Sequence, residues 1–467
     1  MSTAVEPVRD GFRNRHGFIL ACIGSAVGMG NIWRFPIMVS KYGGLTFLIP
    51  YVLFVILIAS SGVIGEFALG RRAGTGPVGA FGSCTQERFG TKKPGRWIGA
   101  LPIVGALMLA IGYTVVLGWI FKYTWMGLSG NLFEMGQNMQ VIGGTFGAAA
   151  PEAKTLTEAV SMMWNKGIFA CGNSLWQVGG LAVALVIMAL GVGRGIEKAN
   201  KLMMPVLFFL FVILAAYIAT LSGAGEGYRY IFTFTPAGLL DPEVWIYAFG
   251  QAFFSLSVAG NGSVIYGSYL PKSEDIPFSA RNVAIFDTIA ALLAMVVILP
   301  AMAVGQVSPN TPGPGLMFVY LPNVFNGMPG GFLVGMIFFV CVLFAGISSI
   351  INLYEAPVEF LQEHLKLKRL PAVLAIGGLG AVVSVMIQPW TSQWMDVVSI
   401  YICPLGALLA GIMFFWVLSK KEALAAVEEG RVSEKPLCRF FYPLGKYIYC
   451  LLALIALIAG AIYGGIG

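Results

Sequence analysis

Long apolar stretches recur along the whole chain, separated by short polar and basic segments. Eleven of them approach twenty residues or more, which is the length that a helix needs to cross roughly 30 Å of hydrocarbon. We number them spans 1 to 11; they cover residues 16–39, 45–70, 98–126, 169–192, 200–222, 242–270, 280–306, 331–362, 370–388, 396–418 and 440–465. The pattern predicts an all-α polytopic membrane protein with eleven transmembrane helices.

The two ends of the pattern define the domain organisation. Residues 1–15 are polar and lack the apolar region and cleavage site of a signal peptide, so they predict a cytoplasmic tail. Residues 16–467 then form a single transmembrane domain without soluble appendages.

Spans 1 and 6 are interrupted by small and polar residues. Span 1 contains GSAVGMGNIWRFP at 24–36, and span 6 contains FFSLSVAGNGS at 253–263. Glycine lowers helix stability by about 1 kcal/mol, and freed backbone groups are tolerated at membrane depth only where they line a cavity or meet protein partners. Both breaks therefore predict a site. For span 1, a packing face formed by Gly24 and Gly28 is the alternative.

The positions of the breaks predict an internal repeat. Equivalent breaks in the first and sixth spans are what two five-helix repeats of opposite topology would produce. We expect repeat 1 at about 16–222, repeat 2 at about 242–418 and an extra helix at about 440–465.

Composition and charge agree with a membrane protein. The chain is 57% hydrophobic and 11% charged. With the N-terminus inside, 23 of the 29 Lys and Arg residues fall in cytoplasmic segments, so the net charge of +7 reports topology and not nucleic-acid binding. An odd number of spans places the C-terminus outside. Seven scattered cysteines and two histidines offer no metal spacing and no catalytic pair, so we expect no enzyme and no organic cofactor.

Four motifs in order along the chain resemble the neurotransmitter:sodium symporter family, whose members have the LeuT fold. They are GSAVGMGNIWRFP in span 1, GEFALGRR closing span 2, GQAFFSLS in span 6 and FAGISSI in span 8. The resemblance implies a 5+5 inverted repeat with discontinuous helices 1 and 6. It also implies uptake of amino acids or related amines coupled to Na⁺ by alternating access.

The resemblance implies two sodium sites. The Na1 site would use Ala26, Asn31, Ser255 and Asp287, and the Na2 site would use Gly24, Val27, Ala345, Ser348 and Ser349. Oxygen ligands of low net charge suit Na⁺. The alternative for the two serines is a hydrogen bond back to their own helix. Asp287 is a lone carboxylate in a span, which is functional by default unless it is protonated against a neighbouring helix. Chloride-dependent members carry a serine where this chain has Ala291, so we expect chloride independence.

Substrate residues follow from the same resemblance. They are Ala26, Gly28, Gly30, Leu109, Tyr113, Phe254, Ser255, Ser257, Gly260, Ser349 and Leu353. Gly28 replaces the aspartate of monoamine carriers and leaves room for a substrate carboxylate near exposed helix amides. An α-amino acid fits. Gly260 and Asn261 leave open a β- or γ-amino acid or an osmolyte.

The resemblance also implies two gates made of paired charges, with incidental surface charges as the alternative for the inner pair. Arg34 would pair with Asp396 on the outer side, and Arg9 with Glu363 on the inner side, with Tyr269 between them. Glu66 would brace the unwound part of span 6. A channel is the least favoured reading, because no ring of polar residues is present.

The expected setting is the inner membrane of a prokaryote. The short tails and the lack of cysteines in the outer loop at 129–168 favour it. The partners are an amino acid, Na⁺ and the lipid bilayer, and the chain is expected to be a monomer or a weak dimer.

Overall fold

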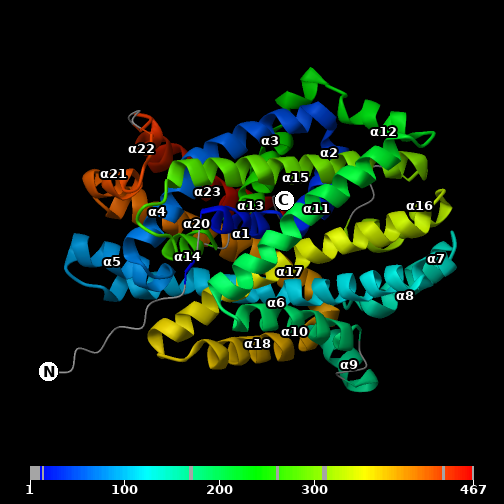
Figure 1. Ribbon diagram of the computed structural model, residues 1–467, viewed down its shortest axis with the longest axis horizontal. Helices are drawn as coiled ribbons and strands as arrows, with labels where there is room; N and C mark the ends of the chain where they lie inside the picture. The colour runs from blue at the N-terminus through cyan, green and yellow to red at the C-terminus, as the bar shows by residue number, and fades with distance from the viewer. Residues whose placement is uncertain are drawn as a thin grey trace.

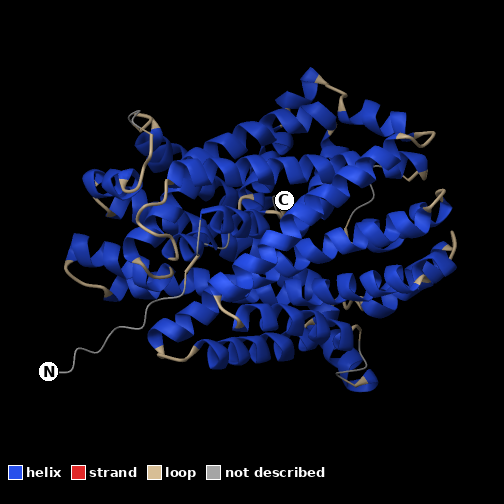
Figure 2. Cartoon of the chain, in the orientation of Figure 1, coloured by secondary structure: helices blue, strands red, loops and turns tan. Residues whose placement is uncertain are grey.

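Helices make up the regular structure of the chain. The computed structural model describes residues 11–12, 15–167, 172–258, 262–307, 313–433 and 437–464, and within these ranges every regular element is helical (Figure 2). The long helices run along the longest axis of the molecule and surround α1, α13 and α14, which lie near its centre (Figure 1).

The helices at the expected spans have definite bounds. The first half of the chain contributes α1 (Arg15–Ala26), η1 (Gly30–Arg34), α2 (Phe35–Tyr42), α3 (Gly44–Ile58), η2 (Ala59–Val63), α4 (Ile64–Ala73), α6 (Lys93–Ser129), α10 (Ser174–Ala189), η3 (Val192–Ile196) and α11 (Glu197–Ala219). The second half contributes α13 (Pro242–Ser255), α14 (Gly262–Ser268), α15 (Ile276–Val304), α17 (Gly331–His364), α18 (Arg369–Met386), η7 (Gln388–Trp390), α19 (Thr391–Val397), η8 (Val398–Ile402), α20 (Cys403–Ile412), η9 (Met413–Val417), α22 (Phe441–Pro443), η10 (Leu444–Tyr449) and α23 (Cys450–Tyr463).

Several neighbouring elements join end to end into longer helices. Among the described residues, eight such helices are long and apolar enough to cross a membrane: Gly44–Ala73, Lys93–Ser129, Val192–Ala219, Ile276–Val304, Gly331–His364, Arg369–Met386, Gln388–Val417 and Phe441–Tyr463. A ninth span forms if the bent pair of span 1 is counted as one. At span 4 the structure has the 16-residue α10, and at span 6 it has two short helices. The total of eleven spans, like the inverted repeat, stays a prediction.

Span 1 is bent where the sequence places its glycines. Helix α1 and the segment Gly30–Tyr42 make an angle of 58°, and Val27 and Gly28 lie in the bend between them. The second half is held at its start by Gln251, whose Nε2 donates to the Gly30 carbonyl at 3.3 Å.

Span 6 is also interrupted. Helix α13 begins at Pro242 behind an Asp241 side chain that accepts from the Glu243 N–H, and it ends at Ser255. Ser257 then has a φ of 57°, a left-handed conformation that ends a helix. Helix α14 begins at Gly262. The residues that we singled out at 259–261 lie outside the described part of the chain.

Span 2 supports both halves of span 6. Helix α13 packs on α3, and α14 packs on α4. The second contact is close, because a Cβ at Gly267 would lie 2.6 Å from the Phe67 carbonyl oxygen, and a Cβ at Gly70 would collide with the Val264 carbonyl. The glycines of the GEFALGRR segment and of α14 therefore let two backbones meet.

Short helices cover the two ends of the bundle. One end carries α5 (Pro77–Phe89) and α21 (Lys420–Glu428), and the other carries α8 (Met139–Ala149), α12 (Ala224–Ile231) and α16 (Leu321–Gly327) (Figure 1). The remaining connecting elements are α7 (Asn131–Glu134), α9 (Leu156–Lys166), η4 (Pro236–Leu240) and η6 (Leu316–Tyr320). The loop expected at 129–168 thus contains three short helices.

Candidate functional site

A buried carboxylate lies where the two interrupted spans meet α15. Asp287 is fully buried in the middle of α15. Its Oδ1 accepts from Nδ2 of Asn31 at 2.7 Å, and its Oδ2 accepts from the Ser255 hydroxyl at 2.7 Å. Asn31 lies just after the bend of span 1, and Ser255 is the last residue of α13. The fold therefore brings together three of the four residues expected at the Na1 site.

The Asn31 side chain ties this cluster to the bend. Its Nδ2 also lies 3.1 Å from the Ser255 hydroxyl, and its Oδ1 accepts from the Gly28 N–H at 3.3 Å. The carbonyl of Ala26, the fourth expected ligand, belongs to the last residue of α1, directly before the bend. Because charge-assisted hydrogen bonds are strong and directional, the cluster fixes the two broken spans against α15.

The two breaks are also joined directly. The Ser257 hydroxyl donates to the Ser25 carbonyl at 2.8 Å, and the hydroxyls of the two serines are 3.3 Å apart. Carbonyls near a helix end often take side-chain partners, and here a side chain from one break binds a carbonyl beside the other. The unwound segments of spans 1 and 6 therefore form one continuous polar region.

The residues expected at the Na2 site lie where α1 faces α17. A Cβ at Gly24 would lie 3.3 Å from Cβ of Ser348, so these two positions are in contact. The Ser348 hydroxyl donates to the Ala345 carbonyl at 3.0 Å, which is the back-bonded geometry that was the alternative for this serine. Ser349 is close to the bend, because a Cβ at Gly28 would lie 2.7 Å from its Oγ.

Asn200 of α11 adjoins the same place and was missed from the sequence. It is buried, its Nδ2 donates to the Ile196 carbonyl at 2.9 Å, and its Oδ1 has no hydrogen-bond partner among the described residues. A Cβ at Gly24 would collide with this oxygen. The sequence shows only a polar residue at the predicted start of span 5. Such a residue looks like part of a loop, which is why Asn200 was not singled out.

The residues expected to contact the substrate differ in their exposure. Leu109 of α6 and Leu353 of α17 are buried, and Tyr113 and Phe254 are partly exposed. A Cβ at Gly30 would meet no atom within 4 Å, so open space adjoins the start of the second half of span 1. Gly260, also expected here, lies outside the described residues.

Arg34 and Asp396, which were expected at the outer gate, do not form a direct pair. The Arg34 guanidinium carbon lies 5.7 Å from the centre of the Phe254 ring, within cation–π distance. Asp396 and Tyr113 are close enough to Arg34 to interact with it electrostatically. The Arg34 guanidinium and the Asp396 carboxylate are nevertheless more than 4.0 Å apart. The arginine therefore covers the ring that was expected to close over the substrate.

Tyr269, which was expected at the inner gate, belongs to a network of charged residues centred on Glu355. Both guanidinium NH₂ groups of Arg369 bind the Glu355 carboxylate, at 2.6 and 2.7 Å, and the Tyr269 hydroxyl donates to the same carboxylate at 2.7 Å. Arg9 lies outside the described residues, so its pairing with Glu363 stays a prediction. The described network joins α17, α18 and the residue that follows α14 through Glu355, which is fully buried.

Comparison with known proteins gives the family. The model of the sodium:neurotransmitter symporter family matches residues 9–429. This chain belongs to that family. It is 32% identical to an uncharacterized sodium-dependent transporter, YhdH of Bacillus subtilis, over 96% of this chain and 97% of that protein. It is also 28% identical to the sodium-dependent neutral amino acid transporter SLC6A17 of Rattus norvegicus, over 63% of this chain and 41% of that protein.

A solved structure agrees with this membership. The crystal structure of MhsT in complex with L-phenylalanine superposes with a TM-score of 0.79 and 30% sequence identity, covering 97% of this chain and 99% of MhsT. The chain therefore has the LeuT-type fold and belongs to a family of sodium-dependent membrane transporters.

Glu66 of α4 was expected to brace the unwound part of span 6 in this symporter. It is buried, and neither carboxylate oxygen has a hydrogen-bond partner among the described residues. The span 6 backbone that it would brace, at 259–261, is not described.

Proposed function

We propose that this symporter imports an amino acid with two Na⁺ ions by alternating access and does not require chloride. The observation that carries the proposal is the buried Asp287 carboxylate, held by Asn31 and Ser255 where two interrupted spans meet. A packing role alone would not call for a carboxylate at this depth, because burying a charge without a cation is costly.

The first ion would bind the oxygens of this cluster. Asp287, the side-chain oxygen of Asn31, the hydroxyl and carbonyl of Ser255 and the carbonyl of Ala26 are all hard ligands, which Na⁺ prefers over nitrogen and sulfur. A single carboxylate balances a single positive charge. The proposed chloride independence follows from this balance.

The second ion would bind between α1 and α17. Its ligands would be the carbonyls of Gly24, Val27 and Ala345 and the hydroxyls of Ser348 and Ser349. The contact of Gly24 with Ser348 supports this assignment. A hydroxyl that bonds back to its own helix keeps a free lone pair, so the Ser348–Ala345 bond is compatible with ion binding.

The amino acid would bind at the bend. Its carboxylate would approach Gly28, the amides at Gly30 and the Tyr113 hydroxyl, because helix N-termini favour anions. An aspartate at Gly28 would require Ser349 to turn away, since even a Cβ would lie 2.7 Å from its hydroxyl. This crowding favours an amino acid over a monoamine.

The rest of the substrate would face α6, α13 and α17. The amine would meet the carbonyls of Ala26, Phe254 and Ser255. The side chain would lie against Leu109 and Leu353, with Ser257, Ser349 and Gly260 completing the pocket. Phe254, beneath Arg34, would close over it.

Two Na⁺ ions would supply enough energy for accumulation. At about 100 mV, two charges that cross the membrane release roughly 4.6 kcal/mol. At 1.4 kcal/mol per decade, this corresponds to about a thousandfold accumulation of a zwitterion. The gates Arg34–Asp396 and Arg9–Glu363 with Tyr269 would alternate around the site.

Uptake into proteoliposomes tests the proposal. We expect labelled amino acid to accumulate when an inward Na⁺ gradient is imposed, to stop when choline replaces Na⁺, and to continue when gluconate replaces chloride. Competition with alanine, leucine, phenylalanine, γ-aminobutyrate and betaine would separate an α-amino acid from the longer substrates that the sequence left open. Accumulation in choline at the same rate would refute Na⁺ coupling.

A further inference from the structure

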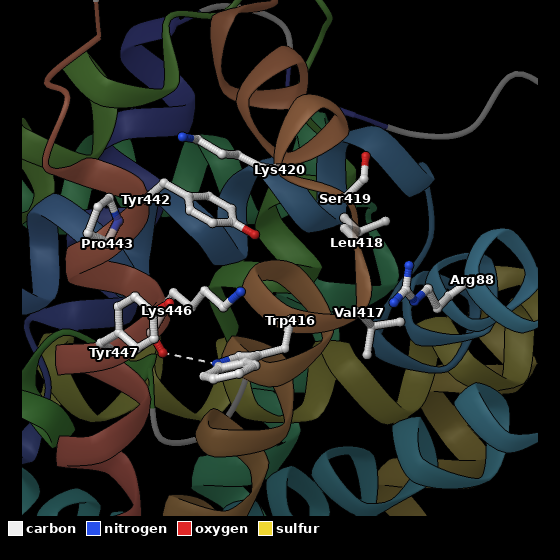
Figure 3. A pocket seen from close by; sticks show the side chains of 10 residues that line it. All are labelled: Arg88, Trp416, Val417, Leu418, Ser419, Lys420, Tyr442, Pro443, Lys446 and Tyr447. Atoms are coloured by element: carbon white, nitrogen blue, oxygen red, sulfur yellow. Dashed lines mark hydrogen bonds between the residues drawn. The ribbon is translucent and has the colours of Figure 1, made fainter.

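Three cationic side chains surround a cavity at one end of the bundle, away from the proposed transport site. The cavity has a volume of about 460 Å³ and lies where the span that ends at Val417 meets the start of the last span. Arg88 from the last turn of α5, Lys420 from the start of α21 and Lys446 from η10 line it (Figure 3). No acidic residue is among the residues that line it.

The three cations lack carboxylate partners within the described part of the chain. The nearby acidic residues Glu87 and Glu422 are both ion-paired with Arg72, the second at 4.0 Å, and Glu422 also accepts from the Ser419 hydroxyl at 2.8 Å. Arg88, Lys420 and Lys446 form no salt bridge with a described residue, so the cavity keeps a net positive charge.

Aromatic rings form the other wall. The Lys446 ammonium lies 4.5 Å from the centre of the Trp416 ring and 5.8 Å from the centres of the Tyr442 and Tyr447 rings. The Trp416 indole N–H donates to the Lys446 carbonyl at 2.9 Å, which fixes the ring beside the ammonium (Figure 3). Trp and Tyr are enriched at the boundary between lipid and water, and these rings lie at the ends of two spans.

An apolar surface continues from the cavity along the last span. Ile448, Leu451, Ile455 and Ile458 recur at helical spacing and are each more than 40% exposed. In a membrane protein, such a surface faces lipid chains. A ligand with an anionic head and apolar tails would fit both parts, whereas free phosphate would use only the cavity.

We propose that this cavity binds the phosphate headgroup of an anionic phospholipid, with its acyl chains along the exposed face of η10 and α23. Arg88, Lys420 and Lys446 attract the anionic headgroup from different sides of the cavity. Basic pockets between transmembrane helices recognise anionic headgroups in this way. The bound lipid joins α5, α21 and the last span, and it is independent of the proposed transport cycle.

Binding to lipid tests the proposal in the purified full-length chain. The probe is dioleoyl phosphatidylglycerol, titrated into protein in detergent and in phosphatidylcholine nanodiscs, and read by native mass spectrometry and thermal stabilisation. We expect about a fivefold loss of affinity for each cation removed, and roughly a hundredfold loss in the triple variant Arg88→Gln, Lys420→Gln, Lys446→Gln. Lys446→Arg should retain binding, because it keeps the charge.

A matched variant separates a specific site from general attraction. Lys92→Gln, Lys93→Gln, Arg96→Gln removes the same charge from exposed positions around the start of α6. This control should bind phosphatidylglycerol as the unchanged chain does, and both triple variants should keep the unfolding midpoint measured in phosphatidylcholine.

Two outcomes would overturn the proposal. Equal losses in the two triple variants would mean diffuse electrostatic attraction. Stabilisation by glycerol 3-phosphate as strong as that by the lipid would mean a site for a soluble phosphate instead.

Discussion

The sharpest test of the proposed Na1 site is the replacement Asp287→Asn. Asparagine has almost the same shape, and its carbonyl oxygen still accepts from Asn31, so the change removes charge with little change in packing. The position is fully buried, so solvent does not replace the lost charge. Removing one partner from a buried ion pair costs about 3–5 kcal/mol. At 1.4 kcal/mol per decade, the Na⁺ concentration for half-maximal binding should rise by roughly two to three and a half orders of magnitude.

Two assays read this shift. The first is the unfolding midpoint of the purified protein as a function of Na⁺, with choline keeping the ionic strength constant. The second is uptake of labelled amino acid in proteoliposomes over the same Na⁺ range. Thr288→Val is the matched control, because the Thr288 hydroxyl bonds back to the Ala284 carbonyl of its own helix at 2.8 Å. It should leave the Na⁺ dependence unchanged.

The size of the change in Na⁺ dependence decides whether Asp287 binds the ion. If Asp287→Asn folds, as its unfolding midpoint without Na⁺ would tell, and its Na⁺ dependence moves by less than tenfold, Asp287 does not bind the ion. The carboxylate would then have a structural role, and the proposed chloride independence would lose its physical basis.

Three further outcomes are expected. Gly24→Ala should impair Na⁺ binding and cost about 1–3 kcal/mol of stability by overpacking, because its Cβ would collide with the Asn200 side chain. Adding Asn200→Ala in the same chain should restore part of the binding and part of the stability. If it restores neither, the contact between the two positions is contradicted. Arg369→Met should lower the unfolding midpoint in detergent by the equivalent of about 3–5 kcal/mol, because it removes the cation that pairs with the buried Glu355. The control Lys368→Met, at an exposed neighbouring position, should have little effect. Equal effects of the two variants would argue against the ion pair. Replacing chloride by gluconate should leave uptake rates unchanged, and a dependence on chloride would show that the site lacks its own compensating charge.

The parts of the fold that follow from apolar length were predictable from the sequence. The bend of span 1 and the interruption of span 6 occur where glycine and small polar residues replace apolar ones. Asp287 was identifiable because a lone carboxylate in an apolar span is rare. Its neighbours Asn31 and Ser255 came from the family resemblance, and their hydrogen bonds required the structure.

Span 5 shows why other features were not predictable. The sequence placed its start at 200, after a polar stretch that resembled a loop, but the continuous helix begins at Val192. Glu197 and Asn200 lie in this stretch and are buried, although the sequence assigned both to water. Lys201 donates to Glu197 and Asn200 donates to the Ile196 carbonyl, so neighbours on the same helix satisfy part of their polar groups. The Glu355–Arg369 pair was missed for a similar reason: it joins two helices whose packing no local pattern reveals.

The hydrogen bonds around Asp287 have a consequence for the return half of a transport cycle. After a carrier has released its substrate and ions, it must return to its starting conformation with empty sites. An ionised carboxylate without a partner inside the membrane would raise the energy barrier of this return step. Here the Asn31 amide and the Ser255 hydroxyl donate to the carboxylate, so if Asp287 binds Na⁺ as proposed, these two donors would take the place of the departing cation. Turnover would then be limited less by a stranded anion than by the exchange of these two donors for Na⁺.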